Sequence, residues 1–235
     1  MMKKLLFAII ATMLLVPAVL AISENSRAKE PLEKITFIHY KDGTVKTSGG
    51  TANGLTCYKL MGVKWKSFPV NYLINPSNSR LDSNFVCNAV TTSAETWDVA
   101  TKSKELFQNY NNCPIDLSAT YGNQNYKNEI SFGNYPTTGV IAITTVWYYP
   151  STKAIAEFDI MFDTDWTWGD AKVNPAVMDL QNIATHELGH AVGLSDIYQS
   201  SCKTVTMYGY SNYGEIQKRT LEQPDITGLQ KLYGA

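Results

Sequence analysis

Runs of β-branched and aromatic residues recur along the chain, and Gly, Pro or Asn bounds each of them. Such runs are typical of β-strands, because these side chains pack well on a pleated surface. A weaker run predicts one further strand at residues 35–40. The main predicted strands are "FPVNYLINP" (68–76), "NEISFGNY" (128–135), "GVIAITTVWYYP" (139–150) and "KAIAEFDIMFDTDWTW" (153–168).

A helical spacing of apolar residues appears between the first two main strands, in residues 79–101. Ser79 and Asp82 are both available as its N-cap, since either side chain can accept from the first free amides of a helix. We therefore predict one amphipathic helix there. Its apolar positions are Val86, Val90, Trp97 and Ala100.

A second long helix is predicted in the last third of the chain. It should begin at Asn174–Pro175, an N-cap followed by a proline in the first turn, and extend to Gly193. A short last helix is expected in "PDITGLQKLYG" (224–234). One helix among the strands and another after them predicts an α/β or α+β layer domain.

The first 21 residues have the organisation of a secretory signal peptide. Lys3 and Lys4 precede an apolar run from Leu5 to about Val16, and small residues lead to a predicted cut after Ala21. An uncleaved membrane anchor is the alternative, because the apolar stretch reaches almost spanning length. Pro17 interrupts it and favours cleavage, so we expect a secreted protein with no stable membrane association.

Composition then bounds the rest of the chain. With 235 residues, 44% hydrophobic and 17% charged, it suits one folded domain. Residues 22–58 are polar and predict a leader or short pro-segment, and residues 59–235 predict the folded domain.

Without Lys3 and Lys4 the net charge is 18 basic minus 21 acidic residues, or −3, which argues against a nucleic-acid partner. We expect a monomer.

Four widely spaced cysteines contain no C-x-x-C pair. In an oxidising compartment an even count favours two disulfides, and three pairings are open. We favour Cys57 with Cys202 and Cys87 with Cys113. The alternative is that Cys57 remains a free thiol and caps a metal ion.

The chemistry of the chain is concentrated in "HELGHAVGLSD", residues 186–196. His186 and His190 lie one turn apart on the same face of the second helix, so both imidazoles can bind one zinc ion. Glu187 is placed to reach a water on that ion without binding the ion itself. Two histidines satisfied by core hydrogen bonds are the alternative, but the chain contains only three in all.

Gly193 follows three residues after His190, where a helix often ends in the left-handed conformation. The reversal would bring Asp196 to the metal as third ligand and leave a fourth position for water, as in a catalytic zinc site. A turn or capping role is the other reading of Asp196.

This motif resembles the extended H-E-x-x-H-x-x-G-x-x-H/D motif of the metzincin zinc endopeptidases. "TVTMYGY" supplies Met207 at the place of the Met-turn in that clan, and the tail resembles the closing helix of matrixin-type members. An aspartate as third ligand is similar to the snapalysin family. The resemblance covers about residues 60–235.

The fold that the resemblance implies is a twisted, mixed, five-stranded sheet with two long helices and a small C-terminal subdomain ending in a helix. The histidine count leaves no room for the second, structural zinc that matrixins often carry. The cysteine-switch motif of that group is not recognisable around Cys57. Tyr208 and Tyr210 flank the position of the clan's metal-associated tyrosine, and each is a candidate for oxyanion binding or for lining a pocket. Tyr213 is a candidate for lining the pocket only.

The activity implied is that of a zinc endopeptidase acting on polypeptides. His186, His190 and Asp196 would hold the ion, which lowers the pKa of its bound water towards about 7. Glu187 would act as general base and pass the proton to the leaving amine. A carboxylate ligand lowers the positive charge of the site, so we expect an activity profile displaced towards alkaline pH.

Two further features concern substrate and ions. The strand at 139–150 is expected to be an edge strand that pairs with an extended peptide. The alternative is an ordinary internal strand, which would have the same sequence pattern. Asp163 and Asp165 offer oxygen ligands to calcium, and a solvent-facing turn explains them at least as well.

Two other functions fit parts of this pattern. One is a catalytically inactive zinc-binding scaffold or surface-interaction protein, which would have no need of Glu187. The other is a zinc amidase acting on a non-peptide amide, which the predicted edge strand disfavours.

Overall fold

The computed structural model describes residues 30–44, 56–102 and 104–235, so the predicted signal peptide lies outside the described residues. Residues Pro31–Ala235 pack as a single unit. Among the described residues, no helix combines the length and the apolar content needed to cross a bilayer.

A mixed sheet with the strand order β2-β3-β5-β4-β1-β8 organises this unit. Its long strands are β1 (Glu33–Lys41), β3 (Glu129–Gly133), β4 (Val140–Tyr149) and β5 (Ala154–Asp163), and its short ones are β2 (Leu73–Ile74) and β8 (Tyr210–Ser211). The strands predicted in residues 128–135, 139–150 and 153–168 are confirmed. The sheet has six strands rather than five, because the short β8 pairs with β1 and adds to the five predicted strands.

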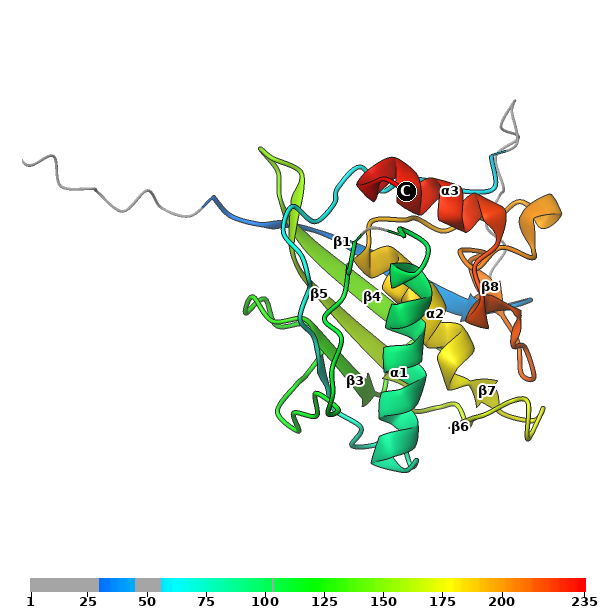
Figure 1. The fold of residues 1–235 in the computed structure, drawn as a ribbon. Coiled ribbons are helices and arrows are strands. Elements are labelled where there is room, and N and C mark those ends of the chain that lie inside the picture. Colours follow the sequence, from blue (N-terminus) through cyan, green and yellow to red (C-terminus); the bar gives the residue numbers. More distant parts are fainter. Residues whose placement is uncertain (1–29, 45–55, 103) are drawn as a thin grey trace, which may run out of the picture. The chain divides into compact units, whose positions relative to one another are not determined.

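Two helices cover one face of the sheet, and in Figure 1 they lie side by side across β4 and β5. They are α1 (Ser83–Asp98) and α2 (Leu180–Ala191). Between helices and sheet lies a core of large apolar side chains that solvent does not reach. It includes Val90, Trp97, Phe107, Phe158, Phe162 and Leu188.

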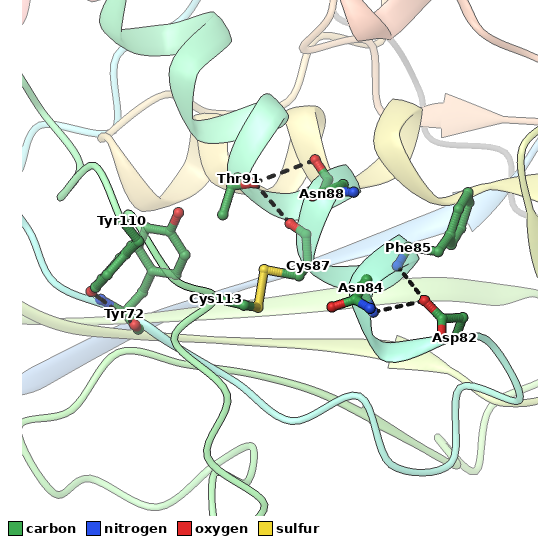
Figure 2. Close-up of a disulfide and its surroundings, with 9 residues drawn as sticks. All are labelled: Tyr72, Asp82, Asn84, Phe85, Cys87, Asn88, Thr91, Tyr110 and Cys113. Carbon is green, nitrogen blue, oxygen red and sulfur yellow. Dashed lines mark hydrogen bonds between the residues drawn. A yellow bond between two sulfur atoms is a disulfide. The ribbon is translucent and has the colours of Figure 1, made fainter.

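The start of α1 follows from its capping residue. The Asp82 carboxylate accepts from the backbone amides of Asn84 and Phe85, as Figure 2 shows. These are amides that no helical carbonyl can satisfy, so the prediction of Asp82 as one of two possible caps is confirmed. The same view contains the Cys87–Cys113 disulfide, which joins α1 to the segment that follows it.

The predicted start of α2 was wrong by about one turn and a half. Asn174 closes a turn of its own by accepting from the amide of Ala176. The chain then forms β7 (Met178–Asp179), which pairs with β6 (Trp168–Gly169). The helix begins only at Leu180, because the buried Asp179 carboxylate caps it through the amide of Asn182.

The C-terminal part contains two 3₁₀ turns, η1 (Ser200–Cys202) and η2 (Gln217–Arg219), and the helix α3 (Gln223–Tyr233). The predicted last helix is thus confirmed. The second disulfide, Cys57–Cys202, joins the start of the domain to this part. Both favoured cysteine pairings are confirmed, and the free-thiol alternative for Cys57 was wrong.

Candidate active site

Helix α2 presents two buried imidazoles on one face. The Nδ1 of His186 donates to the carbonyl of Thr206 at 2.7 Å, and the Nδ1 of His190 donates to that of Leu194 at 2.9 Å. These bonds fix the ring orientations and leave the lone pair of each Nε2 available. Burial lowers the pKa of His186 to about 4, so its ring is the neutral form that a metal ion requires.

The chain reverses direction directly after α2. Gly193 has a φ of 97°, and a side chain there would meet the Val63 carbonyl oxygen at 2.5 Å, so only glycine fits. The reversal brings Asp196 back to the helix. Its Oδ1 lies 3.2 Å from Nε2 of His186 and 3.5 Å from Nε2 of His190.

The three facing atoms fit a zinc ion. Both Nε2 atoms and Asp196 Oδ1 are buried without a hydrogen-bond partner. Ligands bound at about 2.0–2.1 Å with tetrahedral angles lie about 3.3 Å apart, which matches both distances. Burial opposes the charge of Asp196, but His190 and His186 hold its pKa well below the usual range, so it is a carboxylate.

A tyrosine that sequence reasoning missed supports this carboxylate. The Tyr198 hydroxyl donates to Asp196 Oδ2 at 3.0 Å. Burial, and then the charge of Asp196, raise the pKa of Tyr198, so it stays a donor. The only sequence feature that pointed to this contact was the position of Tyr198 two residues after Asp196. A tyrosine at that distance from an acidic residue is too common to predict a hydrogen bond.

Glu187 lies beside the three atoms without joining them. Its Oε2 accepts from the Thr144 hydroxyl at 2.6 Å, and Oε1 is 3.0 Å from Nδ1 of His39. Burial raises its pKa to about 7. A carboxyl group that titrates near neutrality can both take and return a proton.

The described residues contain two groups of three side chains close enough to share a metal ion, and both use His186. The second group adds His39 and Glu187. We favour the group with His190 and Asp196, because His39 and Glu187 already satisfy each other by a hydrogen bond.

Met207 forms the floor of the site. It is fully buried, and a methyl group built on Gly189 of α2 would lie 2.2 Å from its sulfur. Asp225 of α3 accepts from the backbone amides of Thr206 and Met207 and so holds this turn in place. The sequence placed Met207 here by resemblance, and the role of Asp225 was missed because it depends on a contact between distant segments.

Strand β1 corresponds to the strand predicted at residues 35–40. Its position over the site was not predicted from the sequence. It pairs antiparallel with β4 from Glu33 to Tyr40 and parallel with β8 at Tyr40 and Lys41. The Phe37 ring stacks on His190 with centroids 3.9 Å apart, and the His39 ring lies 4.0 Å from that of His186. A cleft of about 520 Å³ remains beside β1, with Asp196 and Tyr198 in its wall.

The other candidate side chains lie around β8. Tyr208 and Tyr210 are largely buried, and Tyr210 pairs with Tyr40 of β1. Tyr213 contacts Trp166 and is 42% exposed. A buried lysine that the sequence did not mark, Lys218, donates to the Tyr210 carbonyl and the Ser211 hydroxyl.

Two predicted features do not join the site. Cys57 cannot cap a metal ion, because its sulfur is bonded to Cys202. Asp163 accepts from the amide of Asp165, and Asp165 accepts from the Asn134 side chain. Neither acid belongs to the groups of potential metal ligands in the described part of the chain.

Comparisons with known proteins identify the family of this chain. The family model described as Matrixin matches residues 64–234. Karilysin of Tannerella forsythia is 30% identical over 187 residues, which cover 79% of this chain and 36% of that protein. Neutrophil collagenase of Homo sapiens is 28% identical over 171 residues, covering 73% and 33%.

The hatching enzyme of Paracentrotus lividus is 26% identical over 174 residues, covering 74% of this chain and 27% of that protein. The chain thus spans about a third of the length of these relatives. Because the family model covers well over half of the chain, and the zinc-binding motif and the turn at Met207 lie within the match, this chain belongs to the matrixin family.

Proposed function

We propose that this matrixin-family protein is a secreted zinc endopeptidase. The observation that carries the proposal is the convergence of His186 Nε2, His190 Nε2 and Asp196 Oδ1, three buried lone-pair atoms without a hydrogen-bond partner. Such atoms are destabilising unless a cation binds them. The names of karilysin and neutrophil collagenase, two relatives by sequence, are compatible with a protein-degrading activity.

Each residue has a distinct task in this mechanism. His186, His190 and Asp196 would hold the ion, which supplies a polarising positive charge and an acidified water. Glu187 would accept a proton from the attacking water and return it to the leaving amine. Thr144 orients the Glu187 carboxylate by donating to Oε2, and Tyr198 orients Asp196.

The substrate would bind as an extended strand at the edge of β4. In the chain itself β1 occupies this edge, so β1 and a substrate exclude each other. We therefore propose that residues 22–58 act as a pro-segment, and that hydrolysis requires β1 to leave. Secretion is supported by the organisation of the first 21 residues and by the two disulfides.

Metal removal and restoration test the activity. The full chain carrying Ile35→Pro and Ile38→Pro would be assayed on an unfolded protein, because proline breaks the pairing of β1 with β4. We expect cleavage that a chelator abolishes and that one equivalent of zinc restores. Zinc binding without cleavage of any peptide would support an inactive scaffold and contradict the proposal.

The unmodified full chain is the matched control for the pro-segment. We expect its initial rate to be at least about tenfold lower than that of the proline variant, because β1 covers the site. Equal initial rates would contradict the pro-segment while leaving the proposed peptidase intact.

A further inference from the structure

Strand β1 contacts the active-site groove as an extended peptide would. It is antiparallel to β4, parallel to β8, and places two alternate side chains, Phe37 and His39, against the α2 histidines. Alternate residues of a strand point to the same side. The side chains of β1 therefore reveal which chemistry each part of the groove accommodates.

The part of the groove that holds His39 is polar. His39 is only 1% exposed. Its Nδ1 lies 3.0 Å from Glu187 Oε1 and its Nε2 lies 3.1 Å from the Ser211 hydroxyl. Both ring nitrogens are thus satisfied inside the protein.

The directions of these hydrogen bonds follow from Lys218. Its ammonium group can only donate, and it donates to Ser211 Oγ at 2.5 Å. The Ser211 hydroxyl therefore directs its own proton to Nε2 of His39. Nδ1 of His39 then carries the ring proton and donates it to the Glu187 carboxylate.

Lys218 lies beside Ser211 and donates to the Ser211 hydroxyl. It is fully buried, and its only other hydrogen-bond acceptor in the described part of the chain is the Tyr210 carbonyl. No carboxylate of the described residues lies within ion-pair distance of its amine, although Glu215, Asp196 and Glu187 act on it from farther away. A buried cation of this kind favours an occupant that accepts a hydrogen bond or carries negative charge.

We propose that Ser211 and Lys218 form a specificity pocket for a substrate side chain that accepts a hydrogen bond, with His39 as its built-in example. Histidine and glutamine fit this description. Ser211 contacts the side chain, and Lys218 acts through Ser211 as a positioning residue. The inference rests on the proposed peptidase function, because it names the substrates of that same groove.

An apolar side chain of similar size should be rejected. It would bury the Ser211 hydroxyl with no acceptor for its proton. Leaving a buried polar group without its partner corresponds to a preference of about 5- to 150-fold. Leucine is the matched apolar probe, since its volume is close to that of glutamine.

The first test uses the full chain and its own strand. His39→Gln keeps an acceptor for Ser211 and a donor for Glu187, whereas His39→Leu keeps neither. Hydrogen exchange of the β1 amides measures how firmly the strand is held, and it needs no turnover. We expect the His39→Gln chain to remain within about threefold of the wild type, and the His39→Leu chain to exchange at least about tenfold faster.

The same pair of substitutions is then made together with Ser211→Ala or with Lys218→Met. We expect the difference between His39→Gln and His39→Leu to shrink by at least about threefold in both, because the donor to the side chain is lost or misdirected while the bond to Glu187 remains. Ser211→Ala keeps the test decisive if Lys218→Met does not fold. Equal protection of the His39→Gln and His39→Leu chains with Ser211 and Lys218 intact would overturn the proposal.

The second test separates the pocket from the activity. Peptides with the sequence of residues 33–42, carrying His, Gln or Leu at the position of His39, are given to the full chain with Ile35→Pro and Ile38→Pro. We expect kcat/KM for His and Gln to exceed that for Leu by about tenfold. Cleavage with Leu preferred would overturn the pocket and leave the peptidase standing.

If no peptide is cleaved, the proposed function fails. The exchange difference between the His39→Gln and His39→Leu chains would then still decide whether the pocket selects an acceptor. The two claims therefore fail separately.

Discussion

At the residue scale, the site consists of two imidazoles and one carboxylate whose ligand atoms face one another. His186 and His190 each donate from Nδ1 to a backbone carbonyl, and each Nε2 faces Asp196 Oδ1. The charge of the third ligand then sets the electrostatic potential at Glu187. With aspartate, ion and ligands together carry about one positive charge less than with a third histidine.

Asp196→His should therefore displace the pH dependence. A more positive site favours the deprotonated form of the acidic groups around it, so the acid limb of kcat/KM should move to lower pH. The comparison uses wild type and variant at equal zinc content. An acid limb at unchanged or higher pH in the histidine variant would show that this charge argument is wrong.

Tyr198→Phe tests the support of Asp196. The change removes one hydrogen bond to Oδ2 and keeps the ring, so we expect zinc affinity to fall by about 10- to 100-fold with little loss of stability. Competition with a chelator of known affinity measures this. Tyr213→Phe, on an exposed ring, is the control, and a similar loss there would contradict a specific role for Tyr198.

At the element scale, helix α2 packs very closely against the turn that contains Met207. Trp97 of α1 donates from its indole nitrogen to the Thr185 carbonyl, and Met207 lies directly under Gly189. The glycine is therefore a contact residue in the last turn of α2, although glycine is otherwise unfavourable within a helix. The proximity of Met207 to the two histidines depends on it.

Gly189→Ala should destabilise the fold although alanine is the better helix former. The added methyl group would meet the Met207 sulfur at 2.2 Å and a Trp97 ring carbon at 2.7 Å. We expect a loss of about 1–3 kcal/mol in the free energy of unfolding, measured by denaturant titration. Gln181→Ala on the same helix should be nearly neutral. A stabilised Gly189→Ala chain would contradict the close packing.

Elements that depend on local sequence patterns were predictable, and elements that depend on contacts between distant segments were not. The strands at 140–149 and 154–163 and the start of α1 follow from local patterns of apolar and capping residues. The start of α2 did not, because Asp179 gains its capping role from burial and from an ion pair with Arg219. Likewise, His186, Glu187, His190 and Asp196 lie within 11 residues, whereas Thr144, His39 and Asp225 reach the site only through the fold.

At the scale of the whole molecule, the sheet carries a cluster of acids on β3 and β5. Glu129, Glu157 and Asp159 are all buried, and Asp159 Oδ1 has no hydrogen-bond partner. Burial, followed by the charges of Glu157 and Glu129, raises the pKa of Asp159 to about 8. The folded protein therefore keeps this proton at pH values where the unfolded chain releases it.

Stability should consequently fall as pH rises from about 4 to about 8. Below that range both states hold the proton, and above it the folded state must bury the charge. Asp159→Asn removes this contribution and keeps the acceptor for the Gly122 amide, so the variant should be more stable at pH 8 by about 1–3 kcal/mol. Denaturant titrations at pH 5 and pH 8 measure it, with the exposed Asp165→Asn as control. An unchanged pH dependence would contradict the buried-acid account.

Across the molecule, the sheet, the helices and the turn at Met207 together place the Glu187 carboxylate beside the three proposed metal ligands. The most direct measurement of that claim is the turnover of zinc-loaded Glu187→Gln, made with Ile35→Pro and Ile38→Pro and compared with its Glu187 parent at equal zinc content. We expect the variant to bind zinc, since Glu187 is not a ligand, and kcat to fall by at least about 10²- to 10⁴-fold. A variant that keeps both its zinc and full activity would contradict the account.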